Sequence, residues 1–260
     1  MYYMNKIKMI ITDLDFSLLN NKRLISEYTK NVCRRCKECG IIIVFATTRP
    51  YRNTRIFYNS VKPDAIICHC GGSVYVDDKI IWQNDVNSNT SYKAFKNIVK
   101  DYPKIGIGVE SEDGIFANFD ISKYWDKIQY KYFDLENFPS KIVYKLIVEL
   151  KHLDSIEKLK KYLPDDLYFE ILEGNIGLIL NKNATKWNGI KKLLEYYAIK
   201  EENTISFGDN DVDLEMIEKC GIGVAMENGN ERIKAKAMYI CKNNNEDGIA
   251  KWIEENIFEK

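Results

Sequence analysis

Apolar residues gather along the chain in short runs that stop abruptly at polar residues. A strand covered on both faces needs apolar side chains at every position, so these runs predict buried strands of a parallel sheet. They are Lys6–Ile11, Ile41–Ala46, Ala65–Cys68, Thr204–Phe207 and Ile222–Ala225. Short runs on either side of Asp77-Asp78-Lys79 predict a small hairpin after the third strand.

Helical patterns separate these strands. Ser26 is placed to cap a helix and Gly40 to end it. The expected helices cover residues 27–39, 186–197, 214–219, 231–237 and 248–256. Alternating strands and helices predict a doubly wound, Rossmann-like α/β core with a parallel sheet.

The middle of the chain has a different pattern. Helices are expected over residues 91–102 and 155–163, and strands over 105–110, 115–119, 142–150, 167–172 and 176–180. Hairpins interleaved with helices indicate an α+β unit with an antiparallel sheet. We therefore expect a core made of residues 1–82 and 183–260, interrupted by an inserted domain at residues 83–182.

Composition restricts the possible partners. Lys+Arg and Asp+Glu both number 38, so no basic excess attracts nucleic acid or an anionic membrane. The longest clean apolar run has six residues, whereas a membrane helix needs about 20. The first residues do not resemble a signal peptide, and the seven cysteines are an odd number. We expect a cytoplasmic protein with reduced thiols; the oligomeric state is left open.

Polar groups with useful chemistry follow three of the predicted core strands. In an open parallel sheet, ligands bind at the carboxyl ends of the strands, so these groups should converge. They are Asp13 and Asp15 after the first strand, Thr47, Thr48 and Arg49 after the second, and Asp209 after the fourth, with Lys186 and Asp213 at helix starts.

This set matches the needs of phosphate-ester hydrolysis. A carboxylate such as Asp13 can act as nucleophile and divide the reaction into two easier steps. Asp15 is placed to protonate the leaving group. Thr47 and Lys186 can stabilise the phosphate oxygens.

The acidic residues also predict a metal site. An anionic nucleophile repels an anionic substrate, so a hard divalent cation is needed between them. Mg²⁺ prefers carboxylate oxygens, water and phosphate. We expect Mg²⁺ to bind Asp13, Asp209 and the main chain near Asp15, with Asp213 nearby.

At these residues the chain resembles the haloacid dehalogenase superfamily, and within it the Cof-type phosphatases with an α+β cap. The four family motifs fall on Asp13-Leu14-Asp15-Phe16-Ser17, Ala46-Thr47-Thr48-Arg49, Lys186 and Gly208-Asp209-Asn210-Asp211-Val212-Asp213. The resemblance covers the whole chain. It implies a phosphatase for a small phosphorylated metabolite, with a sugar phosphate as the expected substrate class and the inserted domain as a cap that sets specificity.

Three positions depart from the family pattern. Phe16 and Thr48 stand where the family has glycine, and Val212 stands where it has asparagine. Thr48 leaves open which of the two threonines meets the phosphate, and alignment favours Thr47. Arg49 either contacts the substrate or pairs with a carboxylate of the core.

Two other functions use the same residues differently. A phosphomannomutase-like phosphotransferase would return the phosphoryl group to a sugar and would need a bisphosphate activator. A non-catalytic binding module would fit the departures at Phe16, Thr48 and Val212, but all the acidic residues are present.

Cys33, Cys36 and Cys39 have metal-site spacing, yet on one helix they are better suited to packing. A structural role is also favoured for His69.

Overall fold

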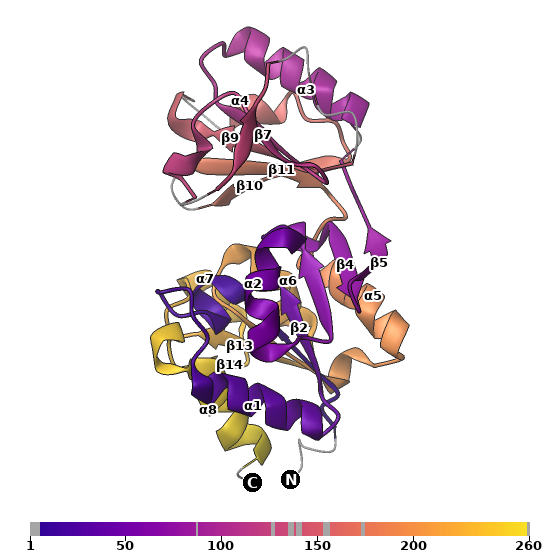
Figure 1. The fold of residues 1–260 in the computed structure, drawn as a ribbon, viewed down its shortest axis with the longest axis vertical. Helices are drawn as coiled ribbons and strands as arrows, with labels where there is room; N and C mark the ends of the chain where they lie inside the picture. The colour runs from indigo at the N-terminus through magenta and orange to yellow at the C-terminus, as the bar shows by residue number, and fades with distance from the viewer. Residues whose placement is uncertain are drawn as a thin grey trace. The chain divides into compact units, whose positions relative to one another are not determined.

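The structure, a computed structural model, describes residues 6–258 except 87, 126–127, 135–137, 139–141, 153–156 and 173–174. Two compact units are present: Met1–Gln83 with Thr185–Lys260, and Asn84–Ala184. Figure 1 shows the helices and strands of both. None of the helices in the described part of the chain has the length and apolar character needed to cross a bilayer.

The first unit is built on an eight-stranded sheet in the described residues. Its strands in spatial order are β14 (Tyr239–Cys241), β13 (Ile222–Met226), β12 (Thr204–Gly208), β1 (Met9–Thr12), β2 (Ile42–Ala46), β3 (Ala65–Cys68), β4 (Ser73–Val76) and β5 (Lys79–Gln83). The strands from β14 to β3 pair in parallel, and β4 and β5 continue as an antiparallel hairpin. The order reverses between β1 and β12, which is where doubly wound sheets bind ligands.

Helices cover both faces of this sheet. One face carries α1 (Glu27–Glu38), α2 (Tyr51–Val61) and α8 (Gly248–Ile253), and the other carries α5 (Lys186–Tyr197) and α6 (Leu214–Lys219), with α7 (Glu231–Lys236) beside α6. Neighbouring strand residues alternate between the two cores: Ile10 packs in the first and Ile11 in the second. This two-sided burial explains the continuous apolar runs.

The second unit has a six-stranded sheet in the described residues. Its spatial order is β10 (Leu167–Leu172), β11 (Ile176–Asn181), β9 (Val143–Glu149), β6 (Ile107–Ser111), β7 (Gly114–Ala117) and β8 (Tyr130–Tyr132). All pairs are antiparallel except β7 with β8. The unit also contains helices α3 (Ser88–Asp101) and α4 (Glu157–Lys160), and its core includes Phe95 and Ile98 of α3.

The predicted fold class, an α/β core with an α+β insertion, is confirmed. Helix α2 and strands β8 and β14 were not predicted, because each buries too few apolar side chains to produce a clear pattern: α2 buries only Thr54, Phe57 and Val61. The predicted helix over 155–163 is α4, four residues long, and residues 155–156 lie outside the described ones. Of the three spaced cysteines, Cys33 and Cys36 are buried, while Cys39 is exposed at the end of α1.

Candidate active site

The first candidate residue lies where strand β1 ends. The amide of Asp13 donates a hydrogen bond to the carbonyl of Phe207 at 3.0 Å, which continues the pairing of β1 with β12 past the strand. The Asp13 side chain is buried. Because β1 and β12 flank the point at which the strand order reverses, Asp13 lies at the crevice expected to bind a ligand.

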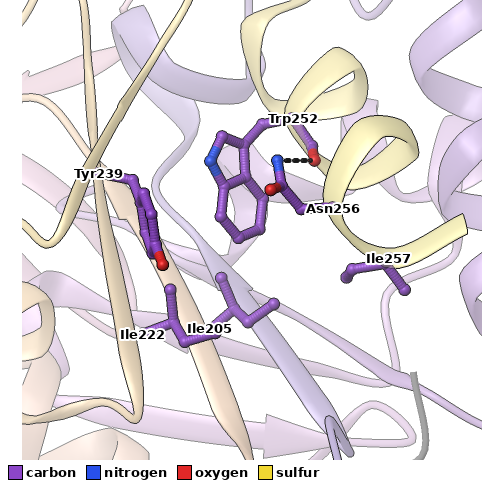
Figure 2. A pocket seen from close by; sticks show the side chains of 6 residues that line it. All are labelled: Ile205, Ile222, Tyr239, Trp252, Asn256 and Ile257. Carbon is purple, nitrogen blue, oxygen red and sulfur yellow. Dashed lines mark hydrogen bonds between the residues drawn. The ribbon is translucent and has the colours of Figure 1, made fainter. Parts of the chain in front are cut away.

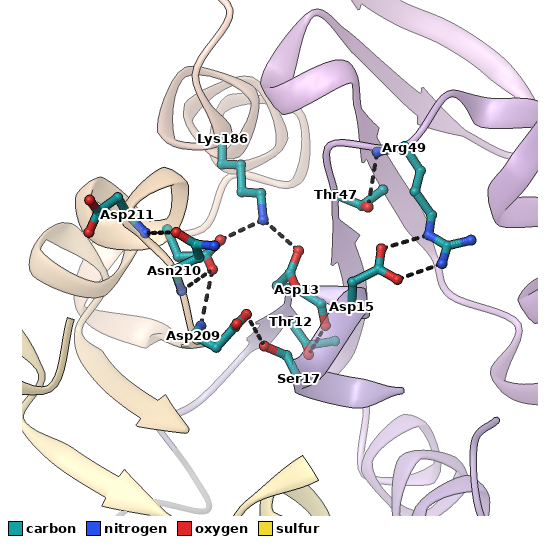
Figure 3. Close-up of polar contacts among 11 residues, drawn as sticks. Thr12, Asp13, Asp15, Ser17, Thr47, Arg49, Lys186, Asp209, Asn210 and Asp211 are labelled. Atoms are coloured by element: carbon teal, nitrogen blue, oxygen red, sulfur yellow. Dashed lines mark hydrogen bonds and ion pairs between the residues drawn. The ribbon is translucent and has the colours of Figure 1, made fainter. Parts of the chain in front are cut away.

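A turn, Leu14–Leu18, follows Asp13, and Asp15 and Phe16 within it have non-helical backbone angles. Phe16 in this turn has a φ of 58°. That conformation is free for glycine but costs energy for a residue with a Cβ atom. The turn brings Asp15 toward Arg49 and Ser17 toward Asp209 (Figure 3).

Lys186, the first residue of helix α5, lies between two carboxylates. Its Nζ atom is 2.6 Å from Oδ1 of Asp13 (Figure 3). The same atom also donates to Oδ1 of Asp213. The lysine side chain is 1% exposed, so both ion pairs are shielded from water. A buried ammonium requires such partners, because removing a charge from water without pairing is strongly unfavourable.

Asp213 holds the loop after strand β12. Its Oδ2 atom accepts the amide protons of Asp209 at 3.1 Å and Asn210 at 3.2 Å, while Lys186 occupies Oδ1. Gly208 makes this possible, because a Cβ atom at position 208 would lie 2.5 Å from the Cβ of Asp213. The carboxylate of Asp213 therefore helps to position Lys186 and the Asp209 loop.

Burial and mutual repulsion change the pKa values of the cluster. Burial raises the pKa of Asp13 well above its usual 3.8; Lys186 opposes this, and the neighbouring acids add to it. Burial, followed by the charge of Asp213, raises the pKa of Asp209 to about 7. Burial would lower the pKa of Lys186, but Asp13 and Asp213 outweigh it and raise that pKa.

The same three acids fit a divalent cation. One oxygen from each of Asp13, Asp209 and Asp213 lies within 4.8 Å of the others. With one lysine among three carboxylates, the fully ionised cluster carries an excess of negative charge, which adds to the effect of burial in raising the pKa values of Asp13 and Asp209. Oxygen ligands of this kind suit Mg²⁺. Ser17 orients Asp209 by donating its hydroxyl proton to Oδ1 at 3.1 Å.

Asp15 is held on the other side of Asp13. Arg49 donates to both of its oxygens, from Nε at 2.7 Å and from Nη2 at 2.5 Å (Figure 3). Arg49 thus pairs with a carboxylate of the core, which was one of its two predicted roles. Its guanidinium carbon also lies 5.1 Å from the centre of the Phe57 ring. Such planar two-bond pairing fixes the orientation of a carboxylate.

The two threonines after strand β2 differ in exposure. Thr47 is fully buried, and its Oγ1 atom accepts the amide proton of Arg49 at 3.1 Å, whereas Thr48 is half-buried. The Thr47 hydroxyl lies beside the Asp15–Arg49 pair in Figure 3. Thr47 is thus the one of the two threonines that is buried beside this pair, and its contact with phosphate stays a prediction.

Comparison with known proteins gives the family. The model of the haloacid dehalogenase-like hydrolases matches residues 10–253. The chain is a haloacid dehalogenase-like hydrolase. It belongs to the Cof-type phosphatases of that superfamily, and it is a phosphatase enzyme.

Two relatives from Bacillus subtilis are 5-amino-6-(5-phospho-D-ribitylamino)uracil phosphatases. YitU is 27% identical over 262 residues, which covers 95% of this chain and 96% of YitU. YcsE is 27% identical over 258 residues, covering 95% of this chain and 94% of YcsE. Among solved structures, the subclass IIB sugar phosphatase BT4131 matches with a TM-score of 0.83 and 23% identity over 95% of this chain and 98% of its own. The structure of the phosphatase BT1666 from Bacteroides thetaiotaomicron matches with a TM-score of 0.87 and 21% identity, covering 97% of this chain and 95% of BT1666.

Some positioning residues of the hydrolase were not singled out from its sequence. Ser17 acts through its hydrogen bond to Asp209, which lies 192 residues further along the chain. Gly208 acts through its close approach to Asp213. Both residues lie inside the family motifs, so motif membership was the signal available. Asn210, which also lies inside the fourth motif, caps the turn Asp211–Asp213.

A small pocket elsewhere in the hydrolase does not belong to this site. Its lining is mainly apolar: Ile205, Ile222, Tyr239, Trp252, Asn256 and Ile257 (Figure 2). The one amide among these residues, that of Asn256, donates to the carbonyl of Trp252 at 2.9 Å. Ile205 and Ile222 lie near the starts of strands β12 and β13, whereas Asp13 follows the end of the parallel strand β1, so the pocket and Asp13 are at opposite ends of the strands. This pocket offers no positive charge for a phosphate group.

Proposed function

We propose that this hydrolase is a Mg²⁺-dependent phosphatase that transfers the phosphoryl group of a small metabolite to Asp13 and then to water. One observation carries the proposal. A buried lysine touches Asp13 at 2.6 Å, and the carboxylates of Asp209 and Asp213 lie within 4.8 Å of the nucleophile's oxygen. The proposed nucleophile, the phosphate-binding ammonium group and the proposed metal ligands therefore lie in one cluster.

In the first half-reaction an oxygen of Asp13 attacks phosphorus and the bond from phosphorus to the ester oxygen breaks. The departing oxygen takes a proton from Asp15, which becomes a carboxylate. Lys186 and the hydroxyl of Thr47 donate hydrogen bonds to the phosphoryl oxygens. Bound Mg²⁺ would supply charge neutralisation between the carboxylates and the phosphate, with Asp13 and Asp209 as its side-chain ligands and Asp213 beside them.

In the second half-reaction water attacks the phosphorus of phospho-Asp13. Asp15 accepts the water proton, the bond between phosphorus and the Asp13 oxygen breaks, and inorganic phosphate leaves. The carboxylate form of Asp15 that this step needs is the form that Arg49 binds. Arg49 therefore supports Asp15, and its two hydrogen bonds must loosen before Asp15 donates a proton to a leaving group.

The expected substrate class is a sugar phosphate. The names of the relatives support this, because BT4131 is a sugar phosphatase and the YitU substrate carries its phosphate on a ribityl chain. A sugar phosphate and the YitU substrate both have a polyhydroxylated carbon chain next to the phosphate. We assign the choice among such substrates to the unit Asn84–Ala184, acting as a cap.

A panel of phosphate esters, assayed with Mg²⁺ and with a chelator, tests the proposal. Sugar and polyol phosphates should be hydrolysed only with Mg²⁺, and rapid acid quenching of a ³²P-labelled ester should trap label on Asp13. Transfer of the label to a second sugar in place of water, with a requirement for a bisphosphate, would indicate the phosphotransferase instead. Full turnover in the chelator, or label on another residue, would contradict the proposal.

A further inference from the structure

The turn after strand β3 connects two parts of the site that are far apart in the chain. Three consecutive residues, His69, Cys70 and Gly71, have φ values of 53°, 60° and 110°. Two of them are not glycine, although that region favours glycine. Such a conformation persists only where its surroundings impose it, and it often marks a functional site.

Two backbone hydrogen bonds attach this turn to the loop that carries Thr47. The amide of His69 donates to the carbonyl of Arg49 at 3.0 Å, and the amide of Cys70 donates to the carbonyl of Thr47 at 3.1 Å. Thr47 in turn donates its amide proton to Ile67 at 2.9 Å. The backbone of Thr47 is thus held from both sides by strand β3 and its turn.

The third residue of the turn touches the start of helix α5. A Cβ atom at position 71 would lie 1.9 Å from the carbonyl oxygen of Thr185, so only glycine fits. That carbonyl accepts the amide proton of Gly189 at 3.1 Å, and the Thr185 hydroxyl oxygen accepts that of Asn188 at 3.2 Å. Gly71 therefore lies against the residue that begins the helix and directly precedes Lys186.

Thr185 is also the first residue of its unit after the insertion Asn84–Ala184. The chain thus passes from the α+β unit to the phosphate-binding lysine in two residues. Helix α5 itself packs in the core of the α/β unit through Trp187 and Ile190. The turn adds a contact within the same unit at the residue that directly precedes Lys186.

We propose that His69–Gly71 is a positioning element that fixes Thr47 and Lys186 relative to each other, independently of the unit inserted between them. The inference rests on the proposed function, because it assumes that these two residues bind the phosphoryl group. The turn acts through Lys186 and Thr47 and not by contact with the substrate.

Gly71→Ala is the test variant, and two glycines provide matched controls. Gly114 has a φ of 117° and Gly40 a φ of 76°, and a Cβ atom at either would meet nothing within 4 Å. Gly114→Ala therefore reproduces the positive-φ strain of Gly71→Ala without the clash. Gly40→Ala introduces positive-φ strain without a clash in the same unit as Gly71. All three should lower the melting temperature. Only Gly71→Ala should weaken the binding of inorganic phosphate, measured by calorimetry with Mg²⁺, by about 10-fold or more.

A double-mutant cycle separates positioning from a general structural role. If the turn acts through Lys186, adding Gly71→Ala to Lys186→Met should weaken phosphate binding little beyond Lys186→Met alone. Additive losses, or a Gly71→Ala variant that binds phosphate as tightly as its two controls, would overturn the inference. Absence of phosphate binding and hydrolysis in the unaltered hydrolase would instead overturn the proposed function.

Amide hydrogen exchange in the unaltered hydrolase tests the inference even if Gly71→Ala does not fold. The amides of His69 and Cys70 should be protected as strongly as those of strand β3, because their hydrogen bonds continue the ladder. Exchange at the rate of a surface loop would show that the turn is too loose to position anything.

Discussion

The character of Asp13 depends on the residues around it. Lys186 binds one of its oxygens, and Asp209 and Asp213 add negative charge within a few ångströms. An isolated aspartate at a strand end would be an ordinary solvated carboxylate. Here burial raises its pKa and Lys186 opposes that rise; in the proposed mechanism a bound cation would also favour the ionised form that attacks.

Asp13→Asn should reduce turnover by roughly 10³-fold or more, because an amide cannot form the acyl phosphate. Steady-state kinetics on a good ester measures this. Asp211→Asn is the matched control: Asp211 lies in the same loop as Asp209 but pairs with Arg232. The control should keep nearly full turnover. A folded Asp13→Asn variant with comparable activity would exclude covalent catalysis.

Asp15→Asn should impair substrates in proportion to the basicity of their leaving groups. An alkyl phosphate needs a proton on its departing oxygen, whereas nitrophenolate leaves without one. In single-turnover experiments, formation of phospho-Asp13 should therefore slow much more for the alkyl ester than for p-nitrophenyl phosphate. Equal slowing of both esters in this step would mean that Asp15 has only a structural role.

At the scale of elements, the start of helix α5 determines where Lys186 lies. Thr185→Ala removes the hydroxyl oxygen that accepts the Asn188 amide proton, which should cost about 1 kcal/mol in the free energy of unfolding. It should also lower activity, because the lysine follows directly. Urea denaturation and kinetics measure the two effects.

Ser26→Ala is the comparison for this helix cap. Ser26 caps α1 by accepting the amide proton of Thr29 at 3.0 Å, and α1 contributes no residue to the site. The Ser26→Ala variant should lose at least as much free energy of unfolding as Thr185→Ala, because the Ser26 hydroxyl also donates to Asp247. Its turnover should stay unchanged. If both variants lose turnover equally, the effect of Thr185→Ala comes from stability and not from the position of Lys186.

At the scale of the whole molecule, the acidic cluster should make stability depend on pH when no metal is bound. The folded-state pKa of Asp209 is about 7 against an ordinary 3.8, so between these values the folded state holds a proton that the unfolded state has released. The free energy of unfolding should therefore fall as pH rises from about 4 to about 7, by at most ~1.4 kcal/mol per unit for this group.

Saturating Mg²⁺ should raise stability and reduce this slope, since the cation favours the ionised carboxylates. Denaturant unfolding at several pH values, with Mg²⁺ and with a chelator, measures the effect. Asp209→Asn should flatten part of the metal-free profile. A profile that Mg²⁺ leaves unchanged would argue against a metal site at Asp13 and Asp209.

The core strands and the motifs could be predicted because each is defined by a few consecutive residues. A strand buried on two faces needs consecutive apolar residues, and β3 and helix α5 follow their predicted ranges without any shift. Weakly patterned elements could not be found in this way. Tyr132 of β8 is 76% exposed, and β14 is an edge strand with two exposed residues, so neither displays the burial on which the pattern depends.

The sequence by itself determined the fold class and the family, and it named the residues proposed to carry the chemistry, because apolar runs and motifs are local features of the chain. Only the tertiary structure decided how those residues pair. Arg49 binds Asp15, Lys186 bridges Asp13 and Asp213, and Gly71 abuts Thr185. These contacts join segments separated by 27 to 173 residues along the chain. Side-chain pairing at such separations depends on sheet order and register, which no local pattern encodes.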